Sequence, residues 1–310
     1  MSKLISTLKW SAVEGQYAAL DLIRGTGDFR LTFRDGKVLT LLFDRHFLQA
    51  RHISYWAGFP KLDKFHRRIL KLYEHGLIAR AKIKPPFRVV SEYAYALTRL
   101  GLQVIAHGLT GEDDETELVE EARQTLTDGW TPPYIWQGAR NAPFHELAVA
   151  DFSLALTELF RLNEQSVLSS GSRALTEHYT LPGRGPYVYS VSPDAAVWAG
   201  ASGREMLLEV QRSVTPKKIA GLLRKYKNYF TARGRRDAFF TEPLVLISID
   251  DIHNEQRYWN QPYEETLRIA KEEFFERAIF IPESRWREDE WVVNKSDGSS
   301  ADLLDYFVRL

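Results

Sequence analysis

Cysteine is absent from the 310-residue chain. Disulfides, thiolate zinc sites and cysteine nucleophiles are therefore excluded, and any metal would have to bind carboxylates, histidines or carbonyl oxygens. Apolar runs of the roughly 20 residues that a transmembrane helix requires are absent too. The chain does not open with a basic segment followed by an apolar stretch and a cleavage site, so we expect a cytoplasmic protein without membrane attachment.

Three motifs of nucleotide and DNA chemistry are also missing. The chain has neither a GxxxxGKS/T phosphate-binding loop nor a GxGxxG dinucleotide fingerprint. The histidine pair and tyrosine that mark rolling-circle relaxases are not found either. We therefore expect neither an ATP-driven helicase nor an enzyme that nicks DNA through a tyrosine.

Net charge is zero, because 41 Lys and Arg balance 41 Asp and Glu, but the charges are unevenly placed. Residues 30–107 hold fifteen Lys and Arg against five Asp and Glu, together with five of the eight histidines. Residues 215–236 hold eight basic residues and no acidic one, whereas residues 111–121 hold seven carboxylates and no basic residue. The two basic stretches are expected to attract a polyanion such as DNA.

The length exceeds what one hydrophobic core usually absorbs, so two domains are expected. The acidic stretch and the turn formers that follow it mark the boundary between them. The expected division is an N-terminal extension at 1–29, a DNA-binding domain at 30–108, an acidic linker at 109–142, a second domain at 143–282 and a C-terminal segment at 283–310. The last eight residues of that segment could form a helix packed on the core or an end that binds a partner, and we expect packing.

Residues 30–108 show the pattern of a winged helix-turn-helix. Apolar periodicity predicts helices at 38–47, 48–56 and 61–73, and Gly76 stands where a C-terminal cap is expected. Strands are predicted at 77–83 and 92–98, with Pro85 and Pro86 in the turn between them. Three helices followed by a two-stranded wing are typical of this DNA-binding fold.

Candidate DNA contacts follow from that assignment. A recognition helix presents its polar face to the major groove, and wing residues reach phosphates or the minor groove. The helix at 61–73 would offer Lys64, Arg67, Arg68 and Lys71, opposite its apolar face, and the wing would offer Arg80, Lys82, Lys84 and Arg88. A merely solvated helix face would show the same charges.

The second domain is predicted to be α/β, which makes the chain α+β overall. An amphipathic helix at 145–163 precedes strands at 177–180, 187–191, 195–198 and 205–210, a basic helix at 216–233, a strand at 243–249, a helix at 263–277 and a strand at 278–281. This order would give a central mixed sheet flanked by helices.

One pair of carboxylates in this domain could carry chemistry. Asp194 follows Pro193, and Glu209 comes after fourteen further residues, on what would be the next strand. Carboxylates on neighbouring strands can share Mg²⁺, which prefers oxygen ligands, and such a site could hydrolyse a phosphodiester. The same spacing also arises by chance in sheets without activity.

With Gln211, this pattern resembles the PD-(D/E)XK nuclease superfamily and so implies a restriction-endonuclease-like domain. The resemblance implies that Asp194 and Glu209 bind Mg²⁺ or Mn²⁺, and it places Gln211 where a lysine is usual. Lys217 or Lys218 could replace that lysine, and Glu146 could add a carboxylate, although a first-turn glutamate also suits the helix dipole. Arg224, Lys225 and Lys227, with Tyr226 and Tyr229 interleaved, would guide the DNA backbone. A helix whose long side chains cover the sheet is the alternative.

The layout as a whole resembles the plasmid replication-relaxation family. The resemblance rests on the winged helix, on His145, Leu147, Val149 and Phe152, and on the PDA and LEV segments, and it extends over residues 38–250. It implies a role in plasmid or mobile-element replication or relaxation, with duplex DNA, a second copy of the chain, and replication or transposition proteins as partners. Two functions stay open: a metal-dependent endonuclease, or a non-catalytic replication initiator or copy-control or transcription regulator. The glutamine at 211 favours the second.

Overall fold

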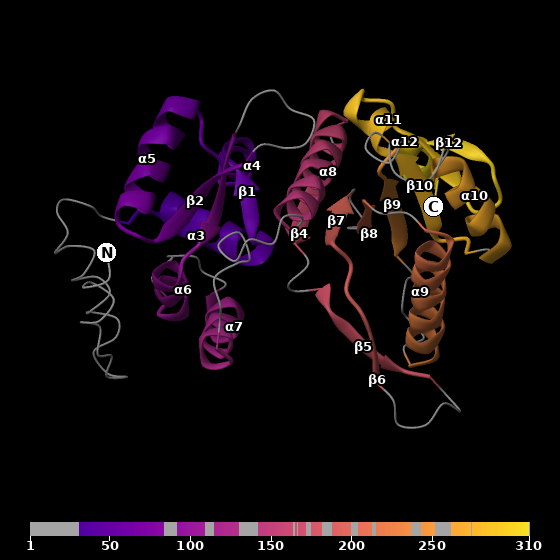
Figure 1. The fold of residues 1–310 in the computed structure, drawn as a ribbon, viewed down its shortest axis with the longest axis horizontal. Coiled ribbons are helices and arrows are strands. Elements are labelled where there is room, and N and C mark those ends of the chain that lie inside the picture. The colour runs from indigo at the N-terminus through magenta and orange to yellow at the C-terminus, as the bar shows by residue number, and fades with distance from the viewer. Residues whose placement is uncertain are drawn as a thin grey trace. The chain divides into compact units, whose positions relative to one another are not determined.

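The computed structural model forms two compact units, residues 1–147 and 148–310. It describes residues 31–83, 92–108, 115–129, 142–163, 165, 167–171, 175–181, 188–199, 204–212, 215–236, 243–251, 262–273 and 275–309. The expected N-terminal extension, the turn with Pro85 and Pro86, and the candidate wing residues Lys84 and Arg88 lie outside the described residues. Figure 1 shows the elements.

The first unit places three helices and a β-hairpin in the expected order. Its elements are α3 (Phe33–Arg45), β1 (Phe47–Gln49), α4 (Ala50–Trp56), α5 (Leu62–Glu74), β2 (Ile78–Ile83), β3 (Glu92–Leu97), α6 (Arg99–Ala106) and α7 (Glu115–Thr127). Strands β1, β3 and β2 form an antiparallel sheet with β3 in the middle. Strand β1 corrects the prediction that residues 47–49 are helical. Its three residues are buried and pair with β3, so tertiary pairing overrides the local helical pattern.

Helix α5 packs one face into the core of this unit. Phe65 and Leu72 are 0% exposed and Ile69 is 4% exposed, which confirms the helical spacing seen in the sequence. Gly76, with a φ of +72°, follows the end of the helix in the left-handed conformation that glycine tolerates. Gly101 on α6 leaves no room for a side chain, because a Cβ there would lie 2.2 Å from the Leu77 carbonyl oxygen.

Part of the expected acidic linker is a packed helix. Val119 and Ala122 of α7 are buried, and the Arg123 Nε donates a hydrogen bond to the Ala106 carbonyl at the end of α6 (2.9 Å). Glu117 and Glu120 are exposed, so these two carboxylates belong to the outer side of a helix whose inner side contacts α6.

The second unit is built on a mixed seven-stranded sheet, which confirms the α/β class. The elements from residue 142 onward are α8 (Ala142–Leu162), β4 (Val167–Gly171), β5 (Glu177–Thr180), β6 (Val188–Val191), β7 (Ala195–Ala199), β8 (Arg204–Gln211), α9 (Pro216–Arg236), β9 (Leu244–Ile249), α10 (Pro262–Glu273), β10 (Ala278–Pro282), α11 (Glu283–Arg287), β11 (Val292–Lys295), β12 (Ser300–Asp302) and α12 (Leu303–Arg309). The strand order is β12-β11-β10-β9-β8-β7-β4. Strands β8, β9 and β10 run parallel, and the other pairs are antiparallel.

Two features of this sheet differ from the prediction. Strands β5 and β6 were expected within it but form a separate two-stranded hairpin, which projects from the sheet in Figure 1. Strands β4, β11 and β12 were not predicted. Strands β4 and β12 are short and lack a run of β-branched or aromatic residues, whereas β11, with Val292 and Val293 after Trp291, carried such a signal. The C-terminal helix α12 packs on the core through Leu303 and Phe307, as expected.

Helices cover both faces of the sheet. On one face, Phe152, Leu156 and Phe160 of α8 pack with Val210 and Leu246. On the other face, side chains of α9 and α10 pack with alternate residues of the same strands, among them Leu207, Ile247 and Phe280. All six residues of β9 are buried, as a central strand covered on both sides requires.

Among the described residues, the structure contains no helix with the length and apolar character needed to cross a bilayer.

Candidate functional site

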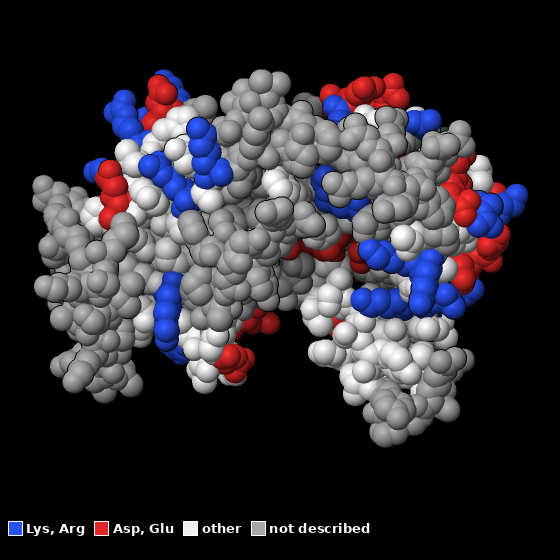
Figure 2. Space-filling model, in the orientation of Figure 1, with Lys and Arg blue, Asp and Glu red and all other residues white. Residues whose placement is uncertain are grey.

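The outer face of α5 is basic. Lys64, Arg67 and Lys71 are exposed on the side of the helix opposite its buried residues, and Lys82 is exposed on β2. Figure 2 shows Lys and Arg side chains over the region of α5. The structure therefore places four of the predicted DNA contacts on the surface of the first unit.

Arg68, also predicted as a DNA contact, is engaged inside the protein. Its guanidinium forms a two-pronged ion pair with Asp35 at the start of α3, with Nε 2.6 Å from Oδ1 and the terminal nitrogen bonded to Oδ2. Asp35 is 0% exposed and also accepts hydrogen bonds from the amide and hydroxyl of Thr32 (2.5 and 2.7 Å). The geometry therefore gives Arg68 the role of joining α5 to α3, and we leave it out of the DNA-facing set.

Arg80 lies between two tyrosine rings. Its guanidinium carbon is 4.3 Å from the ring centre of Tyr73 on α5 and 4.8 Å from that of Tyr93 on β3. Both distances are within the range of a cation–π interaction. The charge is thus held at the junction of α5 and the hairpin.

In the second unit, the register of the sheet brings Asp194 and Glu209 opposite each other. Strand β7 is antiparallel to β8, and Ala195 pairs with Leu208, so that Asp194 continues the pairing at Glu209. The Asp194 amide donates to the Leu208 carbonyl (2.9 Å), and its Oδ2 accepts from the Val210 amide (2.8 Å). The two carboxylates therefore lie on adjacent strands at the carboxyl end of β8.

Tyr226 of α9 joins this pair. Glu209 is only 5% exposed, and its Oε1 accepts a hydrogen bond of 2.6 Å from the Tyr226 hydroxyl. Burial raises the pKa of Tyr226 well above its usual value, and the charges of Glu209 and Asp194 raise it further. The charges of both carboxylates therefore affect the Tyr226 hydroxyl. Since Tyr226 belongs to α9, both carboxylates lie on the face of the sheet that α9 covers.

The carboxylate oxygens of Asp194 and Glu209 are the kind of ligand that a hard divalent cation prefers. Among the described residues, no group of three or more His, Cys, Asp or Glu is arranged to hold a metal ion. Mg²⁺, however, is commonly bound through one or two carboxylates, with waters and substrate phosphates as the other ligands. The oxygens of Asp194 and Glu209 fit that kind of site.

The remaining predicted catalytic residues occupy different places. The Gln211 amide nitrogen lies 3.4 Å from Oε2 of Glu209. Lys217 and Lys218 are exposed in the first turn of α9, the helix that follows β8. Glu146 belongs to the first unit, with a carboxylate oxygen 4.0 Å from Nδ1 of His46.

Helix α9 carries basic residues on its outer side and aromatic residues on its inner side. Arg224 and Lys227 are exposed and Lys225 is half-buried, and Figure 2 shows basic side chains over this helix. The Arg224 Nε is 3.5 Å from a carboxylate oxygen of Glu273 on α10. Tyr226 and Tyr229 are buried, at 0% and 6% exposed, so the prediction that they interleave with the cations along a DNA track is wrong.

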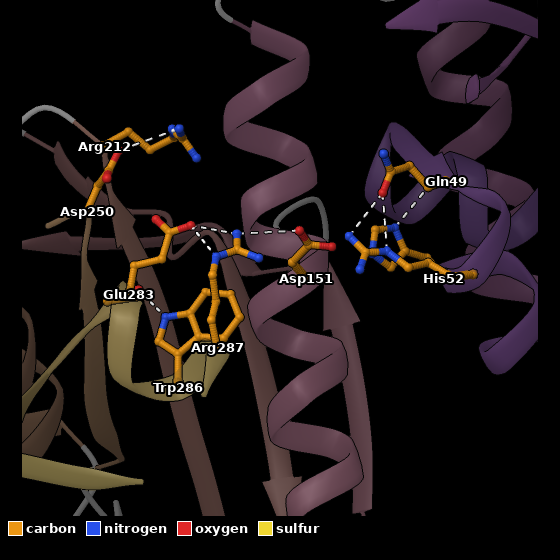
Figure 3. Close-up of polar contacts among 10 residues, drawn as sticks. Gln49, His52, Asp151, Arg212, Asp250, Glu283, Trp286 and Arg287 are labelled. Atoms are coloured by element: carbon orange, nitrogen blue, oxygen red, sulfur yellow. Dashed lines mark hydrogen bonds and ion pairs between the residues drawn. The ribbon is translucent and has the colours of Figure 1, made fainter. Parts of the chain in front are cut away.

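A second polar group, which the sequence analysis missed, lies at the same edge of the sheet (Figure 3). Arg212 pairs with Asp250, which is 1% exposed (3.5 Å), and Arg287 bridges Glu283 and Asp151 (2.5 and 3.5 Å). Asp250 and Glu283 directly follow the buried strands β9 and β10. Since the carboxyl ends of parallel strands share one edge, a charged residue after each apolar strand was the signal that could have identified them.

A family model and a solved structure each match more than half of the chain. No curated protein matches it significantly. A crystal structure of protein VC1899 from Vibrio cholerae aligns at a TM-score of 0.27 and 9% identity, over 89% of this chain and 52% of that chain, which is too weak a likeness to bear on function. The chain thus spans about half of that protein. The family model described as Replication-relaxation matches residues 39–242, more than half of the 310 residues, and the chain therefore belongs to the replication-relaxation family.

Proposed function

We propose that the first unit is a winged helix that binds duplex DNA, and that the protein acts in the replication or relaxation of a plasmid or mobile element. The observation that carries the proposal is the exposed basic face of α5, with Lys64, Arg67 and Lys71 opposite the buried side chains of Phe65, Ile69 and Leu72. Membership of the replication-relaxation family supports the biological setting.

The physical argument rests on the shape and charge of this unit. The major groove of B-form DNA admits one α-helix, and lysine or arginine side chains on that helix reach base edges and phosphates. Helix α5 is thirteen residues long and ends next to the hairpin β2–β3, where Lys82 and Arg80 add positive charge. Helix and hairpin would thus contact adjacent parts of one duplex.

Neutralising Arg67 is expected to lower both the affinity for duplex DNA and the salt dependence of binding. Each lost phosphate contact reduces the slope of log affinity against log salt by about one. Arg67→Gln should therefore lower the slope by about one, and the combined Lys64→Gln, Arg67→Gln and Lys71→Gln variant by about three. Fluorescence anisotropy of a labelled duplex at several salt concentrations measures this.

The control for that experiment is Lys271→Gln, which removes one exposed charge from α10. This variant should keep the slope of the parent. A triple variant of α5 whose slope equals that of the parent would show that α5 does not face the DNA.

A second candidate function is metal-dependent cleavage of the bound DNA. It is favoured by the position of Asp194 opposite Glu209, on the side of the sheet that the basic helix α9 covers. Asp194 and Glu209 would hold Mg²⁺ or Mn²⁺, which would polarise a phosphate and lower the pKa of a water molecule. Lys217 and Lys218 would attract the phosphate, and Gln211 would help to orient Glu209 through its amide.

The alternative is a binding protein without catalysis. Gln211 stands at the position where the resembled nucleases usually have a lysine, and its amide nitrogen approaches Glu209. Such a protein would act as a replication initiator, or as a copy-control or transcription regulator, with a second copy of the chain or other replication proteins as partners.

Removing either carboxylate separates these two functions. If the site cleaves, Asp194→Asn and Glu209→Gln should each slow metal-dependent nicking of supercoiled plasmid by about 100-fold or more, because several kcal/mol of charge stabilisation are lost. Duplex binding should be unchanged, and Glu290→Gln, an exposed carboxylate after α11, should nick like the parent. Intact plasmid after incubation of the parent with Mg²⁺ or Mn²⁺, together with normal binding, would assign the non-catalytic function.

A further inference from the structure

We propose that Tyr226 is a positioning residue, which holds one oxygen of Glu209 so that the other oxygen is presented to a divalent cation. This inference rests on the cleavage site proposed above. It adds a residue from α9 to a site otherwise formed by the ends of β7 and β8.

The contacts of Glu209 carry the proposal. The Tyr226 hydroxyl donates to Oε1 at 2.6 Å, while the Gln211 amide nitrogen lies 3.4 Å from Oε2. The terminal torsion of a glutamate is broad, so that an unsupported carboxylate samples many orientations. A short hydrogen bond from a buried, immobile ring selects one of them and leaves Oε2 on the side of Gln211.

The tyrosine is held firmly enough for this role. Its side chain is 0% exposed and packs edge-on against Phe230, with ring centres 6.2 Å apart. The ring belongs to the apolar group that joins α9 to the sheet, so its hydroxyl cannot turn toward solvent without unpacking the helix. Partners of this kind, which orient a metal ligand without touching the metal, often change metal affinity by about 10- to 100-fold when they are removed.

The test is a calorimetric titration of the purified full-length chain with Mn²⁺, comparing the parent with Tyr226→Phe. Phenylalanine keeps the ring and its packing and removes only the hydroxyl. We expect Mn²⁺ affinity to fall by about 10-fold or more. Tyr179→Phe is the matched control, because Tyr179 is also buried but donates to the Lys225 carbonyl (3.3 Å), and it should bind Mn²⁺ within about twofold of the parent.

A double-mutant cycle makes the result specific. In a Glu209→Gln background, Tyr226→Phe should have no further effect on Mn²⁺ affinity, because the bond that it removes no longer serves a ligand. Parental Mn²⁺ affinity in Tyr226→Phe overturns the inference and leaves the proposed cleavage site standing, even if the metal-free variant unfolds at a lower temperature. A parent chain that binds no Mn²⁺ overturns the proposed cleavage site, and the role of Tyr226 with it.

Discussion

Replacing Arg287 by alanine is expected to destabilise the second unit by about 3 to 5 kcal/mol, because it leaves a buried carboxylate without its counter-charge. Glu283 is 0% exposed, and its Oε1 is bonded to two nitrogens of Arg287 (2.7 and 2.5 Å). Its Oε2 is buried and has no hydrogen-bond partner among the described residues. Urea unfolding followed by circular dichroism measures the loss.

Two further variants test this reason for the effect. Adding Glu283→Met to Arg287→Ala should restore most of the lost stability, since a buried ion pair can often be replaced by apolar side chains without cost. Arg268→Ala removes an arginine that pairs with Glu265 and Glu272 on the surface of α10, and it should leave the unfolding midpoint nearly unchanged. An Arg287→Ala variant as stable as the parent would mean that water, and not Arg287, compensates the charge of Glu283 in the folded protein.

The Arg287 network explains how so short a helix as α11 is held. Five residues are too few for a helix to be stable by its own propensity. Trp286 donates from Nε1 to the hydroxyl of the buried Ser248 on β9 (2.9 Å), and the Arg287 guanidinium lies 4.5 Å from the Trp286 ring centre. Figure 3 shows Arg287 reaching from α11 to Asp151 on α8. Side-chain bonds to β9 and α8 therefore fix α11 at the carboxyl edge of the sheet.

The helices and strands that could be predicted from the sequence are those with a long pattern of apolar residues. Helix α5 and strand β9 have repeated apolar positions, and both were found near their observed bounds. Strand β1 has three residues, and its partner β3 is more than forty positions further along the chain, so its pairing has no local signal. Strand β4 lacks a local signal for another reason, because its sequence is mostly small and polar.

Residues of the candidate site were predictable to different degrees. Asp194 and Glu209 stood out by their spacing, and the sheet register places them opposite each other. Tyr226, Tyr229 and Phe230 recur at intervals of three and four, which indicates a buried helix face. The charges around them favoured the opposite interpretation, that the tyrosines line a DNA track. Periodicity was the better guide, because it reports packing whereas a charge run reports only the solvated side.

Replacing Arg68 by alanine is expected to destabilise the first unit by about 3 kcal/mol, near the lower end of the range for a broken buried pair. Asp35 would keep its hydrogen bonds from Thr32 but lose the charge that compensates it. Arg68→Lys should fall between alanine and the parent, because one ammonium group cannot reproduce the two parallel bonds of a guanidinium. Urea unfolding of the three proteins gives the order.

The same variants test whether Arg68 is structural, as its pairing with Asp35 indicates, or contacts DNA, as the sequence predicted. If Arg68 has the structural role, the folded Arg68→Ala protein binds duplex DNA with the same salt slope as the parent. Its apparent affinity for duplex DNA then falls only in proportion to the fraction of the protein that is unfolded. Arg67→Gln should show the reverse, with a lower slope and unchanged stability, although the two arginines are neighbours in the sequence. A lower salt slope in Arg68→Ala at full stability would instead return Arg68 to the DNA-facing set. The contrast follows from helix geometry: adjacent positions differ by about 100° around the axis, enough to turn one guanidinium toward solvent and the other toward Asp35.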